Sequence, residues 1–388
     1  LCQRHLLNLD QIGDPPLRIE GARQFCQKVV ELPLDEQRPL PERGWPGLLK
    51  KVVAHLHWER LFVDCFGYVQ APGIYWLPST PQRLETVSHT LAEGHYDLAI
   101  SEFESNAELL PPGLNVPRIL ATHNVISSMF RRIRNTYPSS LEDRLFAGPE
   151  YQKIIRYEKR NYASYQGAVA VSREDQRVLQ QRCSKLPVEV IPNGVDVVRF
   201  RPSAAPDNPY TMVYVGNYQY PPNADAVIYF YREIYPRIYN KEPRARLVLV
   251  GADPPAELAG ASGVEMTGLV DDIRPIVQSA GIMVVPLRVG GGSRLKILDG
   301  FAMGKAIVST TVGAEGLAIT PGADILLADR PQAFAEAVLS LMSNADLRSR
   351  LGANGRRLVE RDYDWDILAE RMSDWFGDIV DEFQSSQR

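Results

Sequence analysis

The strongest chemical signal in the sequence is a glycine run that is followed at once by two cations. Gly290–Gly292 lack Cβ atoms, so their backbone N–H groups can approach an anion closely. Arg294 and Lys296 come next, at the start of a predicted helix whose N-terminus itself favours negative charge. Asp299 lies one turn after Lys296 and could accept hydrogen bonds from both hydroxyls of a ribose. The segment predicts a phosphate or diphosphate site; the alternative is a flexible loop with a solvated helix start.

Three other motifs give weaker signals. Gly300–Lys305 is one residue short of a P-loop and lacks its Ser or Thr ligand for magnesium. No G-x-G-x-x-G follows a predicted strand, so hydride chemistry loses its main support. The carboxylates of Asp362, Asp364 and Asp366 alternate along the chain but lack the turn glycine of a calcium loop. We therefore predict no metal site and no cofactor.

Composition narrows the class of protein. The chain has 388 residues, of which 45% are hydrophobic and 23% charged, as in an ordinary globular protein of two domains. A net charge of −4 disfavours a nucleic-acid partner. No apolar run approaches the ~20 residues that span a bilayer. The four cysteines form no CxxC pair, which favours reduced thiols and a cytoplasmic location.

The second half of the chain alternates short apolar runs with helical patterns. Buried parallel strands joined by helices of this length form a doubly wound sheet through right-handed crossovers. The predicted strands are Thr211–Val215, Arg246–Val250, Gly263–Thr267, Ile282–Pro286 and Ala306–Thr310, and the predicted helices are Ala224–Ile238, Asp272–Ser279 and Leu295–Met303.

The first half repeats the pattern less cleanly. Its predicted strands are Lys28–Leu32, Tyr96–Ser101, Arg118–Thr122 and Gly167–Val171. We predict an α/β fold with two Rossmann-like, doubly wound domains facing a cleft. The predicted domains are residues 1–200 and 210–365, with a proline-rich linker over 201–209 and a helix over 366–388 that crosses back to the first domain. Leu1 and Cys2 resemble the end of a strand with no βα unit before it, so we expect the first domain to lack its opening βα unit.

Several segments resemble one family, in its order and spacing. They are VAVS (169–172), IPNGVD (191–196), YVGN (214–217), YPPNADA (220–226), GLVDDIRP (268–275), VPLRVGGGSRLK (285–296) and STTVGAEGL (309–317). The second half resembles the nucleotide-sugar-binding domain of retaining GT-B glycosyltransferases of family 4. Bacterial members that assemble exopolysaccharides or surface glycans are the most similar.

The resemblance implies roles for individual residues on the donor side of the cleft. Arg294 and Lys296 would bind the donor diphosphate and stabilise its charge, and Asp299 would bind the ribose. The family commonly has two glutamates eight residues apart, where this chain has Gly291 and Asp299. The implied donor-binding set is Gly216, Asn217, Leu269, Val270, Gly291, Gly292, Ser293, Arg294, Lys296, Asp299 and Glu315. Within it, Leu269 and Val270 would meet the base, and Glu315 would border the diphosphate and sugar.

A single histidine completes the predicted site. His123 follows the predicted strand Arg118–Thr122 and resembles the histidine that the family sets against the transferred sugar. A buried structural histidine is the alternative. Ligands of open α/β sheets bind beyond the carboxyl ends of strands, which favours the functional interpretation.

The resemblance implies a retaining transfer from a nucleotide diphosphate sugar, UDP- or GDP-linked, to a glycan or lipid-linked acceptor. Two alternatives stay open: a GT-B-fold nucleotide-sugar 2-epimerase and a non-catalytic nucleotide-sugar binder. The basic clusters near Arg131–Arg134 and Lys153–Arg160 suggest peripheral contact with the inner face of a membrane, and solvated helix faces would give the same pattern.

Overall fold

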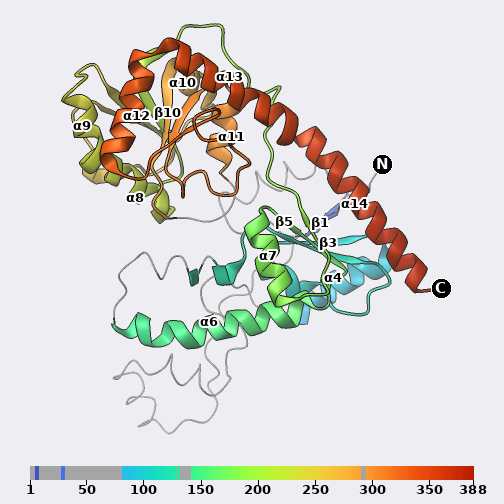
Figure 1. The fold of residues 1–388 in the computed structure, drawn as a ribbon. Helices are drawn as coiled ribbons and strands as arrows, with labels where there is room; N and C mark the ends of the chain where they lie inside the picture. Colours follow the sequence, from blue (N-terminus) through green and yellow to red (C-terminus); the bar gives the residue numbers. More distant parts are fainter. Residues whose placement is uncertain (1–4, 8–27, 31–80, 129, 132–140, 290–293) are drawn as a thin grey trace, which may run out of the picture.

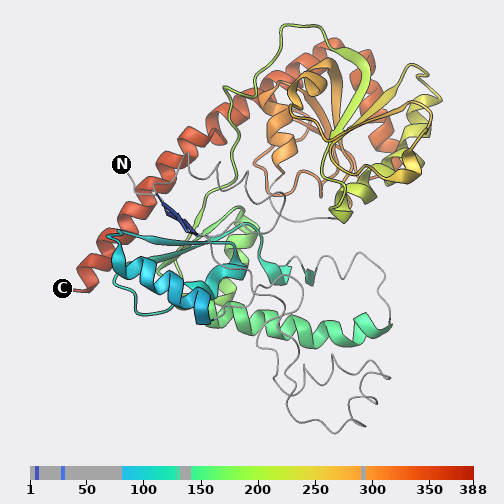
Figure 2. The ribbon, with the colours of Figure 1, turned by 180° about the vertical axis from the view of Figure 1, so that it is seen from behind.

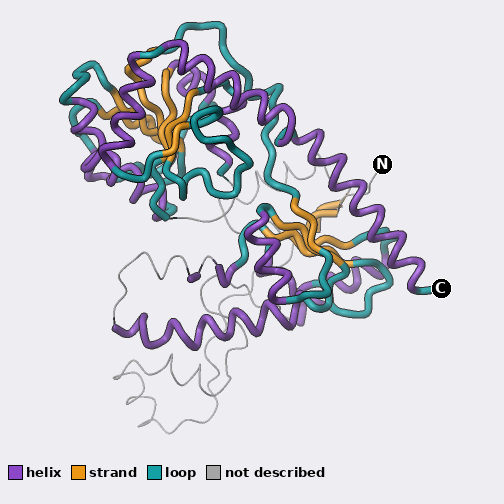
Figure 3. The backbone as a smooth tube through the Cα atoms, in the orientation of Figure 1, coloured by secondary structure: helices purple, strands orange, loops and turns teal. Residues whose placement is uncertain are grey.

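We describe residues 5–7, 28–30, 81–128, 130–131, 141–289 and 294–388 of a computed structural model of the chain. Two parallel sheets, each with its own helices, form two α/β domains, and a long C-terminal helix runs along both (Figure 1). Figure 3 shows the strands gathered in these two separate groups. Within the described ranges, none of the helices combines the length and apolar character needed to cross a bilayer.

The second domain is built on a six-stranded parallel sheet in the order β12-β11-β10-β7-β8-β9. Strands β10 and β11 are buried along their whole length, as expected for a sheet covered on both faces. The strands are β7 (Asn208–Val215), β8 (Arg246–Val250), β9 (Val264–Gly268), β10 (Ala280–Val285), β11 (Ala306–Ser309) and β12 (Leu326–Leu327).

Helices cover both faces of this sheet. From the central pair β7 and β10 the chain proceeds outward in opposite directions, so right-handed crossovers place the connecting helices on opposite faces. The helices are α8 (Pro221–Tyr229), α9 (Tyr235–Tyr239), α10 (Arg274–Ser279), α11 (Leu295–Ala302), α12 (Pro331–Ser343) and α13 (Ala345–Asp362).

The first domain has a four-stranded parallel sheet in the order β3-β4-β5-β6. Its strands are β3 (Ala99–Glu102), β4 (Arg118–Thr122), β5 (Gly167–Ala170) and β6 (Val188–Val190), and its helices are α4 (Pro81–Glu93), α6 (Leu141–Tyr162) and α7 (Arg173–Arg182). A separate parallel pair joins β1 (His5–Leu7) to β2 (Lys28–Val30). The expectation of a missing opening βα unit falls on a part of the chain that is mostly outside the described residues.

The predicted strands Arg118–Thr122 and Arg246–Val250 coincide with β4 and β8 at both ends. Strand β7 instead begins at Asn208, inside the segment predicted as linker. The prolines there suggested irregular chain, but Pro209 lies at a bulge in the pairing of β7 with β10. A Cβ on Gly281 would lie 2.6 Å from the Pro209 Cα, so the glycine makes room for the proline.

The predicted helix Ala224–Ile238 is interrupted. A π-helical segment, Phe230–Ile234, separates α8 from α9, and the Tyr235 N–H donates to the Phe230 carbonyl five residues earlier. Pro236 has no N–H to continue the α-helical pattern, which explains the shift in hydrogen bonding at this point.

Helix α14 (Trp365–Ser386) connects the two domains (Figure 2). Leu368 and Ile379 are buried in one cluster with three residues of the first domain, Ile119, Val169 and Ile191. Because the helix leaves the second domain and packs on the first, it ties the two domains together.

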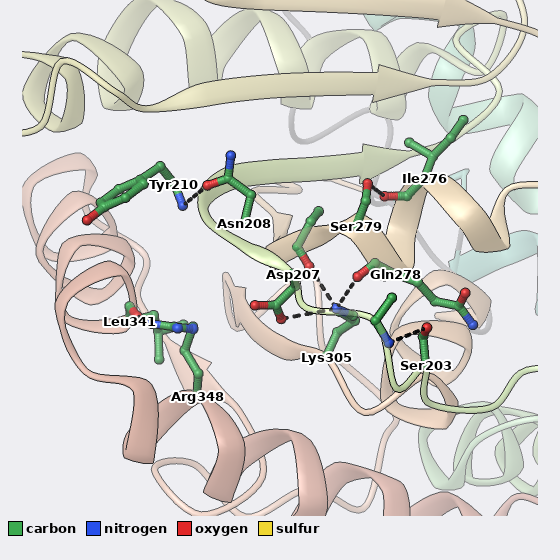
Figure 4. Close-up of polar contacts among 12 residues, drawn as sticks. Ser203, Asp207, Asn208, Tyr210, Ile276, Gln278, Ser279, Lys305, Leu341 and Arg348 are labelled. Atoms are coloured by element: carbon green, nitrogen blue, oxygen red, sulfur yellow. Dashed lines mark hydrogen bonds and ion pairs between the residues drawn. The ribbon is translucent and has the colours of Figure 1, made fainter.

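Lys305 is a structural lysine at the amino edge of the second sheet. Its Nζ donates to the carbonyls of Gln278 and Ala280, both at 2.8 Å, and lies 3.3 Å from Oδ2 of Asp207 (Figure 4). Burial lowers the pKa of Lys305, and Asp207 opposes this effect. Through Lys305, the residue before β7 is linked to α10 and to the start of β10. These contacts lie at the amino ends of the strands, opposite the carboxyl ends where the site is predicted.

Candidate active site

The carboxyl ends of β7 and β10 lie side by side where the strand order of the second sheet reverses. Ligands of open α/β sheets bind in the crevice beyond the strand ends at such a switch point. The turn after β7 holds Gly216 and Asn217, and the segment after β10 leads to α11. Gly291, Gly292 and Ser293, predicted to contribute to the site, lie outside the described residues.

Lys296 reaches from α11 to the neighbouring strand. Its Nζ lies 2.8 Å from the hydroxyl oxygen of Tyr214, on β7, and 2.9 Å from Oδ1 of Asn223, on α8. The Nζ also lies 4.1 Å from the centroid of the Tyr214 ring. Residues far apart in the sequence thus place the amine at the switch point.

The environment of Lys296 disfavours its charged form. Burial, and secondarily the positive charge of Arg294, lower the pKa of Lys296 to about 7. Burial also raises the pKa of Tyr214, so this phenol keeps its proton at neutral pH. Lys296 is therefore only partly ionised near neutrality, and an anion bound beside it and Arg294 would favour its charged form.

Asn223 fixes the geometry around the amine. Its Oδ1 also accepts a hydrogen bond from the Tyr214 hydroxyl at 2.7 Å, and its Nδ2 donates to the Asn217 carbonyl at 2.7 Å. A Cβ on Gly216 would lie 3.0 Å from Cγ of Asn223, so this glycine leaves space for the amide. Two residues predicted from the sequence, Gly216 and Asn217, therefore support Lys296 through Asn223.

Arg294 is buried immediately before α11. Its Nη2 donates to the Val312 carbonyl at 2.8 Å and lies 3.5 Å from Oε2 of Glu315. The ion pair brings Glu315 next to Arg294, and its role at the donor stays a prediction. A Cβ on Gly316 would lie 3.5 Å from Cβ of Ser172, so this turn also comes close to the first domain.

Asp299 lies on α11, one turn beyond Lys296, and its side chain is partly buried. Burial raises the pKa of Asp299 to about 6, and the charge of Arg199 opposes that shift. Its role toward a ribose stays a prediction.

The turns that follow β7, β8 and β9 are joined by their backbones. The Gly216 N–H donates to the Val250 carbonyl at 2.9 Å, and the Gly251 N–H donates to the Gly268 carbonyl at 3.0 Å. Gly251 has φ +135°, and a Cβ there would lie 1.9 Å from the Gly216 oxygen. Leu269 and Val270 directly follow β9 and so belong to the third of these turns. Leu269 is 81% exposed. The residues predicted to meet the base thus share one edge with the turn after β7.

In the first domain, His123 follows β4, and its Nε2 lies 2.8 Å from Oε2 of Glu102, the last residue of β3. The imidazole packs on the ring of Phe103, with the centroids 4.4 Å apart. Phe103 has φ +64°, a strained conformation for an aromatic residue that is often associated with function. The buried structural role considered for His123 does not fit its partly exposed side chain.

Two buried carboxylates hold the chain after His123. Glu104 Oε2 accepts the Ile126 N–H at 3.1 Å, and Glu158 Oε1 accepts the Ser127 N–H at 2.9 Å. Because a helix begins at Ile126, the carboxylates satisfy N–H groups that have no partner within that helix. Burial raises the pKa of both carboxyl groups.

Sequence reasoning did not find Tyr214, Asn223 or Glu102. Glu102 directly follows the predicted strand Tyr96–Ser101, so its position at a strand end was the available signal. Asn223 lies in the YPPNADA segment, but nothing local indicates its distant partner.

The alternating aspartates near the start of α14 have structural partners. Asp364 caps the helix through the Asp366 N–H at 3.3 Å, and Asp362 pairs with Arg361. Over the described ranges, no group of three or more His, Cys, Asp or Glu residues is arranged to hold a metal ion.

Known proteins match this chain most clearly in the second domain. Residues 209–344 match a family model described as "Glycosyl transferases group 1". The GDP-mannose-dependent monoacylated alpha-(1-6)-phosphatidylinositol monomannoside mannosyltransferase of Corynebacterium glutamicum is 24% identical over 212 residues, 48% of this chain and 55% of that protein. The chain spans about half the length of the curated relatives it matches.

Solved structures resemble the chain over most of its length. Anabaena Alr3699/HepE, solved with UDP and glucose, has a TM-score of 0.64 at 14% identity and covers 96% of this chain and 99% of its own. Sucrose-phosphate synthase from Thermosynechococcus elongatus has a TM-score of 0.63 at 18% identity, covering 81% and 83%. The fold is therefore the GT-B fold of glycosyltransferases, as predicted from the sequence.

Proposed function

We propose that this protein is a glycosyltransferase that moves a sugar from a nucleotide diphosphate sugar to an acceptor hydroxyl. The observation that carries the proposal is the pair of cations, Arg294 and Lys296, at the switch point beyond β7 and β10. A diphosphate leaving group gains negative charge as the glycosidic bond breaks. Basic side chains already held in place at that point stabilise this charge without having to reorganise.

The comparisons support the nature of the donor. One structural neighbour was solved with UDP and glucose, and one relative is named as a GDP-mannose-dependent mannosyltransferase. We propose a UDP- or GDP-linked hexose as the donor, with Asp299 at the ribose and Leu269 and Val270 beside the base.

Retention of the anomeric configuration is part of the proposal and rests on the resemblance to family 4. In this mechanism the acceptor attacks on the face that the leaving group departs from, and the donor phosphate helps to deprotonate the acceptor. His123 would contact the transferred sugar from the first domain, with Glu102 supporting its ring.

A glycan or lipid-linked acceptor, in polysaccharide or surface-glycan assembly, completes the proposal. We place the protein in the cytoplasm, in peripheral contact with the inner face of the membrane. Support comes from four basic residues on α6, of which three are exposed: Lys153, Arg156, Lys159 and Arg160. Binding of the protein to anionic vesicles but not to neutral ones would support the membrane contact, independently of the transfer reaction.

The transfer itself is tested with radiolabelled UDP- and GDP-sugars and a panel of glycan and lipid-linked acceptors. We expect label in the acceptor fraction, with a rate lowered about 10²–10³-fold in each of the Arg294→Ala and Lys296→Ala variants. Arg350→Ala, at an exposed cation on α13, is the matched control and should keep the wild-type rate. Interconversion of the donor without transfer would instead indicate an epimerase, and retention of intact donor alone would indicate a binding protein.

A further inference from the structure

The hydrogen bonds at Lys296 match a neutral amine as well as an ammonium ion. A neutral amine has two N–H donors, and the two acceptors at its Nζ are the Tyr214 hydroxyl and Asn223 Oδ1. The Asn223 amide cannot turn its NH₂ toward the lysine without losing its hydrogen bond to the Asn217 carbonyl. An ammonium ion has three donors, so a protonated Lys296 gains one N–H beyond those that the protein uses.

The charged groups around Lys296 do not favour its protonation. In the described part of the chain, no carboxylate oxygen lies within 4.0 Å of its Nζ, although such ion pairs are found for other lysine and arginine residues. The nearest charged residue in sequence is Arg294, two positions earlier, and its positive charge opposes a second one.

The carboxylates on the elements around Lys296 either pair with arginine residues or lie one helical turn from the lysine. On α8, Asp225 pairs with Arg288. After β11, Glu315 pairs with Arg294. On α11, Asp299 is partly buried one turn beyond Lys296, and Arg199 is the charged group that stabilises its ionised form.

We propose that binding of a nucleoside diphosphate draws one proton from the solvent onto Lys296, which the Tyr214–Asn223 pair holds ready as a neutral amine. This inference rests on the proposed function, because it takes the diphosphate of the donor as the ligand. The buffer acid gives up the proton, and the lysine lone pair accepts it. The resulting ammonium keeps its two protein acceptors and directs its third N–H to the anion.

The electrostatics give the expected size of the effect. Since burial and Arg294 lower the pKa of Lys296 to about 7, the free site carries little charge on this lysine at pH 8. A bound diphosphate restores the charge, so uptake should approach about 0.9 proton per nucleotide at pH 8, fall to about 0.5 at pH 7 and to about 0.1 at pH 6.

The experiment is calorimetric titration of the whole chain with UDP and with GDP at pH 8, in buffers of different ionisation enthalpy. The slope of the observed heat against that enthalpy gives the number of protons taken up. At pH 8 the nucleotide phosphates are already deprotonated. Asp299→Asn should bind nucleotide more weakly but take up the wild-type number of protons per bound nucleotide, which separates Lys296 from the other titrating group at the site.

Two variants assign the proton. Lys296→Arg keeps a permanent positive charge and should bind nucleotide with an uptake below about 0.2 proton. Asn223→Asp places a carboxylate beside the amine, keeps it charged, and should likewise abolish uptake while weakening binding about tenfold or more. Wild-type binding without uptake, or undiminished uptake in Lys296→Arg, would overturn the inference and leave the proposed function standing. Failure of both nucleotides to bind would overturn both.

Discussion

Oε2 of Glu102 lies 2.8 Å from Nε2 of His123; Glu102 ends β3, and His123 directly follows the neighbouring strand β4. The contact joins Nε2 of the ring to Glu102. Phe103 packs on the same ring and keeps its plane in place. The pair is the first domain's contribution to the proposed site.

This relationship predicts a non-additive pair of substitutions. Glu102→Ala should lower kcat about tenfold, the effect of losing one charge-assisted hydrogen bond, and His123→Ala about 10²-fold. Because Glu102 acts through His123, the double variant should be no slower than His123→Ala alone. Steady-state rates of the four proteins test this, and a double variant slowed by the product of the two single effects would show that Glu102 acts independently.

A second prediction concerns the backbone contact between the turns after β7 and β8. Gly251→Ala should lower the free energy of unfolding by about 3 kcal/mol or more, because its Cβ would overlap the Gly216 oxygen. Gly260→Ala is the control: Gly260 also has a positive φ, but a Cβ added there would meet no atom within 4 Å, so a cost of about 1 kcal/mol is expected. Urea unfolding measures both, and equal losses would show that the close approach is not what requires Gly251.

Burial of Asp299 predicts a stability that depends on pH. Its carboxyl pKa is about 6 in the fold against 3.8 ordinarily, so the folded state holds the proton more tightly and ionisation costs stability as pH rises between those values. Asp299→Asn should therefore be more stable than the wild type by about 1–3 kcal/mol at pH 8, with the difference disappearing toward pH 4. Urea unfolding at several pH values checks this, and an advantage independent of pH would contradict it.

Transfer is expected to need no divalent cation, because Arg294 and Lys296 supply the positive charge that a metal supplies in other transferases. After dialysis against EDTA the rate should stay within about a factor of two of the untreated rate, and added Mn²⁺ should not raise it further. A large loss that Mn²⁺ restores would contradict the assignment of the diphosphate to these two side chains.

The local part of the site could be predicted from the sequence, and the distant part could not. Arg294 and Lys296 lie two residues apart, so local sequence was sufficient to expect both at the start of a helix, where α11 begins. The partners of Lys296 are 73 and 82 positions earlier in the chain, and only the adjacency of β7 and β10 brings them together.

The same distinction holds for the fold. Strand β8 was predicted to the residue because its apolar run is continuous. The start of β7 was misplaced because Pro209 signals irregular chain unless one knows that it faces Gly281, 72 positions later. The interruption of the helix after α8 likewise depends on a local shift in hydrogen bonding that periodicity does not reveal.

The most direct test of the diphosphate site is the equilibrium binding of UDP and GDP compared with UMP and GMP. For whichever base the protein accepts, the diphosphate should bind about 10–100-fold more tightly than the monophosphate, since only it reaches both cations. Arg294→Ala should reduce that ratio to about threefold or less, whereas Arg350→Ala should leave it unchanged. Equal affinity for the two nucleotides, or a ratio that Arg294→Ala does not alter, would contradict the assignment of Arg294 and Lys296 to a donor diphosphate.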